Sequence, residues 1–85
     1  SILFQNSPNP FSDKTEITYY LPQNIQSAFL YIYDMNGNQL KQITLTQKGN
    51  ASIIINSRQF GAGMYLYSLI ADNQLIDTKR MILTK

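Results

Sequence analysis

Short stretches in which apolar and polar residues alternate recur along the whole chain, and no window keeps the period of an amphipathic helix. In residues 15–21, for example, Ile17, Tyr19 and Leu21 stand at alternate positions, so a strand there places all three on one face. β-branched and aromatic residues, which suit strands, dominate these stretches. The pattern predicts seven strands, over residues 2–5, 15–21, 27–34, 39–45, 51–56, 64–71 and 75–84.

Turn-forming residues separate the predicted strands. Asn36-Gly37 predicts a type I′ hairpin turn, because both central residues of that turn need positive φ. Asp72-Asn73 predicts a second hairpin, and Pro22 is expected to end the second strand. Short strands with turns at this spacing favour an all-β fold, an immunoglobulin-like antiparallel β-sandwich.

The length of 85 residues fits one domain, residues 1–85, with a core of modest size. No apolar run is long enough to span a membrane as a helix, and the first residues lack the basic start and apolar core of a signal peptide. The chain also starts without Met. We therefore expect it to be the C-terminal piece of a longer protein.

Composition excludes several kinds of active site. The absence of Cys and His removes zinc sites, disulfides, Cys nucleophiles and His bases. The five acids are scattered, so a catalytic carboxylate pair is not expected. Asp34 and Gly37 lie in a stretch that fails the spacing of a calcium loop, and we assign them to the turn itself. The sequence therefore predicts no enzyme, no metal and no cofactor.

Positive charge is sparse, since the net charge is +2 and only 14% of residues are charged. The Lys and Arg residues are scattered except at the end of the chain, where Lys79, Arg80 and Lys85 lie close together in sequence. Binding to phosphate backbones needs a basic patch, so no nucleic-acid partner is expected.

Aromatic residues mark two further places. Phe29, Tyr31 and Tyr33 share one face of a predicted strand, where they could form a stacking platform for sugars or fill a half-buried sheet surface. If that face were exposed, it would form an apolar patch large enough to need a partner. Gly63 lets the chain enter the sixth strand sharply, and the Tyr65 hydroxyl is expected to bond back to the preceding loop, as in a tyrosine corner.

Five segments, taken in order, carry a resemblance to a known family. They are Pro8-Asn9-Pro10-Phe11, "ITYYLP" (residues 17–22), "YDMNG" (residues 33–37), "GMYLYSL" (residues 63–69) and "KRMILTK" (residues 79–85). Together they resemble the type A C-terminal sorting domain of cargo proteins of the type IX secretion system of Bacteroidetes. The residues that match the family's motifs are Pro8, Asn9, Pro10, Asp34, Gly37, Gly63 and Tyr65.

The resemblance implies a secretion signal rather than a catalyst. Such domains fold in the periplasm at the end of secreted enzymes and adhesins, and the outer-membrane translocon recognises them and exports the attached cargo. A sortase-like peptidase commonly removes the domain, and the cargo is then released or attached to the cell surface. The implied partners are the N-terminal cargo domain, the translocon and the peptidase, with cleavage expected at or before Ser1.

The predicted last strand is the candidate recognition element. We expect it to pair with residues 64–71, with Ile76, Ile82 or Leu83 facing the core and the basic side chains projecting outward. An edge strand is a template for strand addition by a partner, although Lys residues can also guard an edge against aggregation. The hypothesis assigns translocon recognition to Lys79, Arg80, Met81, Ile82, Leu83 and Lys85.

Two other functions remain open. A carbohydrate- or surface-binding module of a secreted enzyme could use the aromatic row, and fold alone does not separate it from a sorting signal. A structural module could form a homodimer through an unpaired edge strand.

Overall fold

The computed structural model describes residues 1–84, so Lys85 lies outside the described residues. Its strands are β1 (Ile2–Leu3), β2 (Lys14–Leu21), β3 (Ala28–Asp34), β4 (Gln39–Thr44), β5 (Gly49–Asn56), β6 (Gly63–Ala71) and β7 (Gln74–Leu83), with a short 3₁₀ turn at Ser57–Gln59. Strand β1 is shorter than predicted, and β2 ends just before Pro22 as expected. No helix within the described residues is long and apolar enough to cross a membrane.

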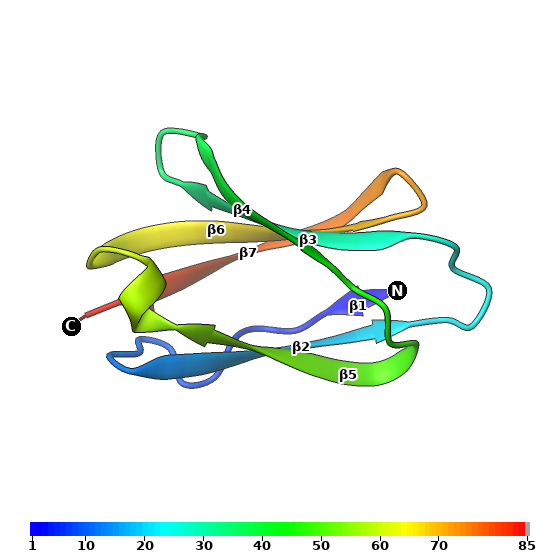
Figure 1. The fold of residues 1–85 in the computed structure, drawn as a ribbon, viewed down its shortest axis with the longest axis horizontal. Helices are drawn as coiled ribbons and strands as arrows, with labels where there is room; N and C mark the ends of the chain where they lie inside the picture. Colours follow the sequence, from blue (N-terminus) through cyan, green and yellow to red (C-terminus); the bar gives the residue numbers. More distant parts are fainter. Residues whose placement is uncertain (85) are drawn as a thin grey trace.

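The strands pair antiparallel in two sheets that face each other (Figure 1). A three-stranded sheet has the order β1-β2-β5, and a four-stranded sheet has the order β4-β3-β6-β7. The edge strands are therefore β1 and β5 in the first sheet, and β4 and β7 in the second. This arrangement confirms the predicted immunoglobulin-like antiparallel β-sandwich of seven strands.

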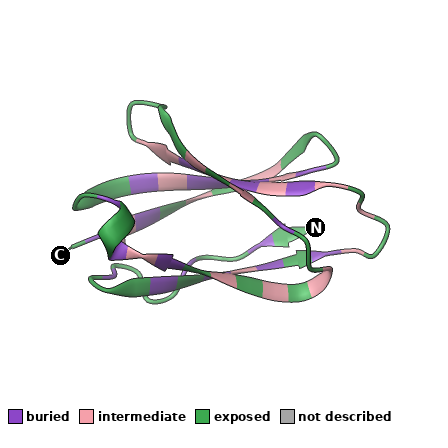
Figure 2. Ribbon diagram, in the orientation of Figure 1, coloured by how far each residue is buried: buried purple, intermediate pink, exposed green. Residues whose placement is uncertain are grey.

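Buried residues alternate with less buried ones along β2 and β3 (Figure 2), because every second side chain of a strand points into the space between the sheets. The pattern confirms that Ile17, Tyr19 and Leu21 share one face of β2, which is the inward one, and the burial of β3 and β6 shows which of their side chains also point inward. Each large apolar side chain buried in this way stabilises the fold by about 1.5–3 kcal/mol. The core side chains of these three strands are Ile17, Tyr19, Leu21, Ala28, Leu30, Ile32, Tyr65, Tyr67, Leu69 and Ala71.

The first hairpin turn differs in geometry from the predicted type I′ turn. Here Gly37 donates its N–H to the Asp34 carbonyl at 3.1 Å, and Gly37 has φ of 87° while Asn36 is not among the residues with positive φ. This is a type I turn followed by a left-handed glycine, and the β3–β4 register shifts beside it. The predicted type I′ turn at Asn36-Gly37 is therefore wrong, because the Asp34 side chain caps the type I form.

The type I′ geometry occurs instead at the second hairpin. Asp72 and Asn73 have φ of 48° and 64°, and they join Ala71 directly to its partner Gln74. Asx residues tolerate the left-handed region better than other non-glycine residues. The Asp72 carboxylate also accepts hydrogen bonds from the backbone N–H groups of Gln26 and Ser27, which ties this turn to the β2–β3 connection.

Candidate functional site

Four of the five motif segments, which are far apart in sequence, meet at one end of the sandwich, whereas residues 17–22 follow β2 toward the other end (Figure 1, where the end of β7 is red and residues 6–13 are blue). Strand pairing sets Gly63 opposite Leu83, and it aligns Tyr65 with Met81 on one side and with Asp34 on the other. Phe11 forms a parallel bridge with Leu83. The candidate recognition strand therefore finishes among the motif residues.

The segment of residues 5–11, called here the closing segment, is bound to the outer edge of β7. Its backbone contacts are made by Phe11, which donates to the Ile82 carbonyl and accepts from the Thr84 N–H, both at 2.9 Å. Its side-chain contacts come from Asn9, which accepts from the Ile82 N–H at 2.9 Å, and from Gln5, which donates to the Arg80 carbonyl at 2.6 Å. The closing segment thus takes the place of a neighbouring strand.

This arrangement corrects one expectation about β7. The Arg80 carbonyl, both backbone groups of Ile82 and the Thr84 N–H already have partners in the closing segment, so this part of the edge is not free for strand addition. Farther back, the Asp77 carboxylate accepts from the Thr78 N–H at 2.8 Å. A partner that reads the bound end of β7 in the folded domain therefore contacts its side chains.

Alternation divides the predicted recognition residues between two faces. Met81 and Leu83 are 0% and 1% exposed in the core, while Arg80 is exposed and Ile82 half-buried on the outer face. Leu83 rather than Ile82 therefore faces the core. Lys79 points to the core side at its rim, where its ammonium lies 3.4 Å from the Asp77 carboxylate, so it does not form one basic patch with Arg80.

A buried polar network anchors the closing segment to both sheets. The Tyr67 hydroxyl accepts from the Asn6 N–H at 2.7 Å and donates to the Phe4 carbonyl at 2.8 Å. The Asn6 side-chain amide donates to the Thr15 hydroxyl at 3.0 Å, and that hydroxyl donates to the Pro8 carbonyl at 2.8 Å. Burial raises the pKa of Tyr67 to about 12, against the lowering effect of the bond from Asn6.

Sequence reasoning missed Gln5, Asn6 and Tyr67 as parts of this end of the molecule. Gln5 and Asn6 precede the P-N-P motif, and their partners in β6 and β7 lie more than 60 residues away. The one available signal was the pair of prolines, which marks residues 6–14 as a connection outside the sheet interior. Both prolines follow cis peptide bonds.

Asp34 and Gly37 have the turn role that was predicted for them. The Asp34 carboxylate accepts from the N–H groups of Asn36 and Asn38, both at 2.9 Å, and from the Asn38 side-chain amide at 3.0 Å. The side-chain amide of Asn38, followed by its backbone N–H, holds the pKa of Asp34 below its ordinary value. Among the described residues, no three acidic side chains gather into a metal-binding group.

Tyr65 forms the predicted tyrosine corner. Its hydroxyl donates to the Gly61 carbonyl at 2.5 Å, and its ring packs against Phe60 with centroids 5.3 Å apart. Gly63 starts β6 with φ of 147°, a region that side chains rarely adopt. Phe60, Gly61 and Tyr65 also line an open hollow of about 590 Å³ with Leu40, Lys41 and Gln59. The Lys41 ammonium donates to the Gln59 side-chain carbonyl at 2.8 Å across it.

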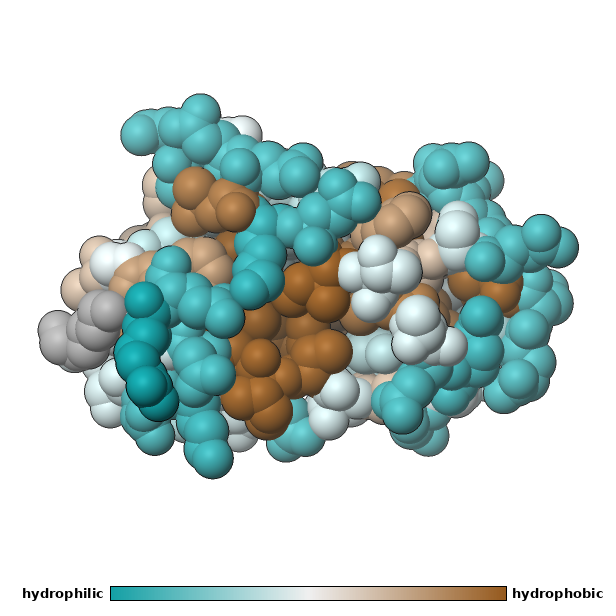
Figure 3. All heavy atoms as spheres, viewed as in Figure 1, coloured by the Kyte–Doolittle hydropathy of each residue, from teal (hydrophilic) through white to brown (hydrophobic). Residues whose placement is uncertain are grey.

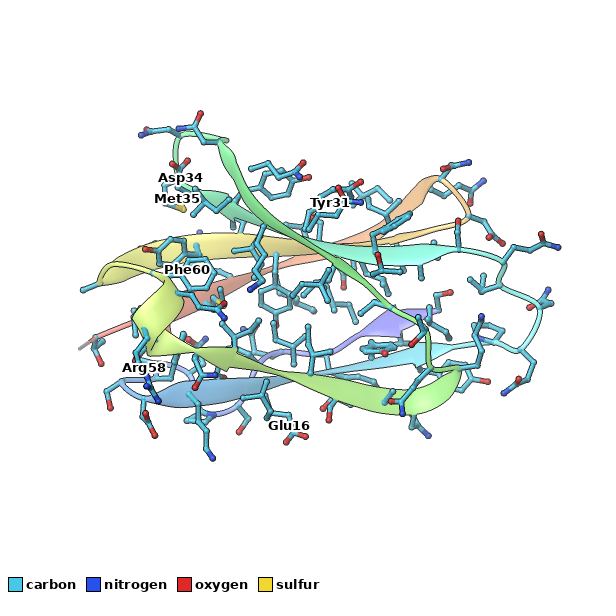
Figure 4. The ribbon with its side chains drawn as sticks, in the orientation of Figure 1. Glu16, Tyr31, Asp34, Met35, Arg58 and Phe60 are labelled. Carbon is cyan, nitrogen blue, oxygen red and sulfur yellow. The ribbon has the colours of Figure 1, made fainter. Side chains whose placement is uncertain are left out.

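The aromatic row lies on the outer face of the four-stranded sheet, and all three rings are half-buried. Figure 4 shows Tyr31 on the side of its sheet that faces away from the core. The ring centroids are 6.3 Å apart for Phe29–Tyr31 and 6.2 Å for Tyr31–Tyr33, with tilts of 39° and 30°. These spacings suit contacts between the rings. Gln42 and Ser68 flank Tyr31 on the neighbouring strands.

Comparison with known proteins gives one match. Residues 7–84 match the model of a family described as "Secretion system C-terminal sorting domain", which covers nearly the whole chain. Searches of curated proteins and of solved structures gave no match.

Proposed function

The chain belongs to the family of secretion system C-terminal sorting domains, and from this membership we propose that it is the type IX sorting signal of a secreted cargo protein. A sorting domain implies a cargo protein that carries it, recognition by the secretion system, and export to the cell surface or extracellular space. In this proposal residues 1–85 fold as one domain behind the cargo, in the periplasm, before the outer-membrane translocon exports both.

We propose further that the translocon reads the outer face of β7 beside the closing segment. The exposed Arg80 is the observation that carries this proposal, because it is a charged side chain on backbone fixed by Gln5 and Asn9. Arg80 pairs with Leu66 of β6. Ile82 pairs with Met64 of the same strand, and Met64 is 37% exposed. An Arg among apolar side chains is typical of residues that dominate interfaces.

Secretion of a fluorescent fusion tests this proposal. A signal peptide and a fluorescent protein are placed before residues 1–85 in a bacterium with an active type IX system, and fluorescence is measured in the medium and periplasm. Arg80→Glu is compared with Lys14→Glu, a matched charge reversal at an exposed residue of β2. We expect Arg80→Glu to reduce export at least about tenfold while the domain stays folded.

The outcomes test the sorting function and the recognition of β7 through Arg80 separately. Export of the unaltered fusion with equal export of Arg80→Glu rejects the reading of β7 and keeps the sorting function. Retention of the unaltered fusion in the periplasm rejects the sorting function. Equal losses in both variants indicate a nonspecific effect of charge and also reject the role of Arg80.

Removal of the domain by a sortase-like peptidase belongs to the same proposal. Residues 5–11 are held by β7 and by the network around Asn6, which protects them from proteolysis in the folded domain. This supports cleavage upstream, at or before Ser1. Mass spectrometry of the exported cargo locates the cut, and a cut between residues 5 and 11 contradicts this placement.

A second candidate function is carbohydrate binding by the aromatic row. The observation that favours it is that Phe29, Tyr31 and Tyr33 keep half-exposed rings beside the exposed polar side chain of Gln42. Affinity electrophoresis in soluble polysaccharides tests it with the unaltered domain and with Tyr31→Ala. Retardation that Tyr31→Ala abolishes supports this function, and unretarded migration in every polysaccharide rejects it.

A further inference from the structure

The four edge strands differ in how they are protected against pairing with another chain. Strand β1 has only two residues, and β7 is bound by the closing segment. Strand β4 has a register shift at its start and an inward-facing Lys41. Short length, covered edges, bulges and inward charges are the devices by which proteins prevent edge-to-edge association. Three of the four edges therefore carry a protective device.

Strand β5 has none of these devices. It has eight residues, it pairs with β2 without a register shift from Asn56 to Gly49, and it contains no charged residue and no proline. Its centre is Ile53-Ile54-Ile55, a run of residues with high strand propensity. A long, regular, uncharged edge of this kind is a template for strand addition.

The direction of the β5 backbone groups follows from the hydrogen bonds of β2. Glu16 exchanges backbone hydrogen bonds with Ser7, on the side of β2 away from β5. Because bonded pairs alternate along antiparallel strands, Ile17 and its partner Ile53 bond to each other. The backbone groups of Ser52 and Ile54 consequently point toward the open edge.

Hydrophobic surface accompanies this edge. The Ile54 side chain is 54% exposed on the outer face, and Ile53 is only partly buried on the inner face. On the edge strand β4 of the facing sheet, Ile43 is also partly buried. Figure 3 shows hydrophobic atoms gathered over the middle of the molecule, in the region between β4 and β5 in Figure 1. Pairing along β5 would cover part of this surface.

We propose that a second copy of this chain pairs with β5, antiparallel and across a two-fold axis, so that two three-stranded sheets become one continuous six-stranded sheet. Self-pairing sets the outward residues Asn50, Ser52 and Ile54 against the same residues of the second copy. Since β5 carries no charge, no like charges meet across the new contact, as they would along a charged strand. The inference does not depend on the sorting function.

Sedimentation velocity of residues 1–85 from micromolar to millimolar concentration tests the proposal. In the unaltered chain Ser52 donates to Glu16 of the same copy at 2.6 Å, so Ser52→Lys places a cation beside that carboxylate within each monomer. In the proposed dimer the same substitution brings the two new Lys residues close together, and their like charges repel. Ile54→Pro removes one outward N–H, a change that an edge strand tolerates. Gln42→Pro is the matched control, because its N–H points outward on β4.

We expect the unaltered chain to dimerise with rising concentration and both β5 variants to weaken dimerisation at least about tenfold. Gln42→Pro should dimerise like the unaltered chain. Circular dichroism checks folding, and Ser52→Lys decides the matter if Ile54→Pro does not fold. A chain that stays monomeric at every concentration overturns the proposal. So does dimerisation that the β5 variants retain or that Gln42→Pro alone removes.

Discussion

Single residues hold the two halves of this sandwich together, and Tyr67 is the clearest case. Its ring is 0% exposed, and its hydroxyl is the one group that joins β6 to the backbone of both Phe4 and Asn6. Each hydrogen bond of such a buried hydroxyl adds only modestly to stability. Its removal costs more, because the partner groups are then buried without a hydrogen bond.

Tyr67→Phe is therefore expected to destabilise the domain by about 1–3 kcal/mol, because it leaves the buried Asn6 N–H without an acceptor. Urea unfolding measures the change. Tyr20→Phe, at an exposed tyrosine of β2, serves as control and should change stability by less than about 0.5 kcal/mol. Equal stability of Tyr67→Phe and the unaltered domain contradicts the role of the hydroxyl.

Asp34 gives a prediction for acid pH. Its bonds from Asn38 hold its folded pKa below the ordinary value of about 3.9, so its contribution to stability is present above that value and is lost as the pH falls through the folded pKa. Carboxyl NMR titration should place its midpoint below about 3.9. Asn38→Ala should move the midpoint upward, and an unchanged midpoint argues against this cause.

At the scale of elements, the strands could be predicted from the sequence, but the turn geometry and the segment that covers β7 could not. Alternation in the sequence predicted which residues of β2 and β3 share a face, and the structure shows which of these faces points into the core. Turn geometry could not be predicted, because the Asp34 carboxylate selects the type I form at Asn36-Gly37. The closing segment was also out of reach, since its bonds to β7 join residues more than 70 positions apart.

Asn9→Ala is expected to loosen the closing segment without unfolding the sheets. The Ile82 N–H then loses its acceptor, and its hydrogen exchange should become about tenfold faster. Exchange measured by NMR should stay unchanged at amides in the centre of β3. Asn24→Ala, in the exposed β2–β3 connection, is the control, and exchange at Ile82 that matches this control contradicts the contact.

At the scale of the whole molecule, motif residues from across the chain form one structural end. Each motif looked weak alone because its partner lies in another motif, as Gly63 and Phe11 show in their pairing with Leu83. Within the candidate site, sequence reasoning found the strand and the motifs. It did not find that Met81 and Leu83 belong to the core while Arg80 remains outside, because one register step reverses the faces.

Deletion of residues 79–85 is therefore expected to unfold the domain rather than to remove a signal from an intact fold. It takes away Met81 and Leu83, and burial of side chains of this size is worth about 2–5 kcal/mol each. Circular dichroism and proteolysis of the truncated chain measure the outcome. A truncated domain that melts cooperatively near the temperature of the unaltered one contradicts this expectation.

The parallel bridge between Phe11 and Leu83 has a mechanical consequence. The two ends of the described chain lie well apart along the long axis (Figure 1), and the closing segment runs in the same direction as β7. A force that pulls the first residues away from the end of β7 therefore loads the hydrogen bonds of Gln5, Asn9 and Phe11 in shear, all at once. A load of that geometry meets far more resistance than one that opens the same bonds one after another.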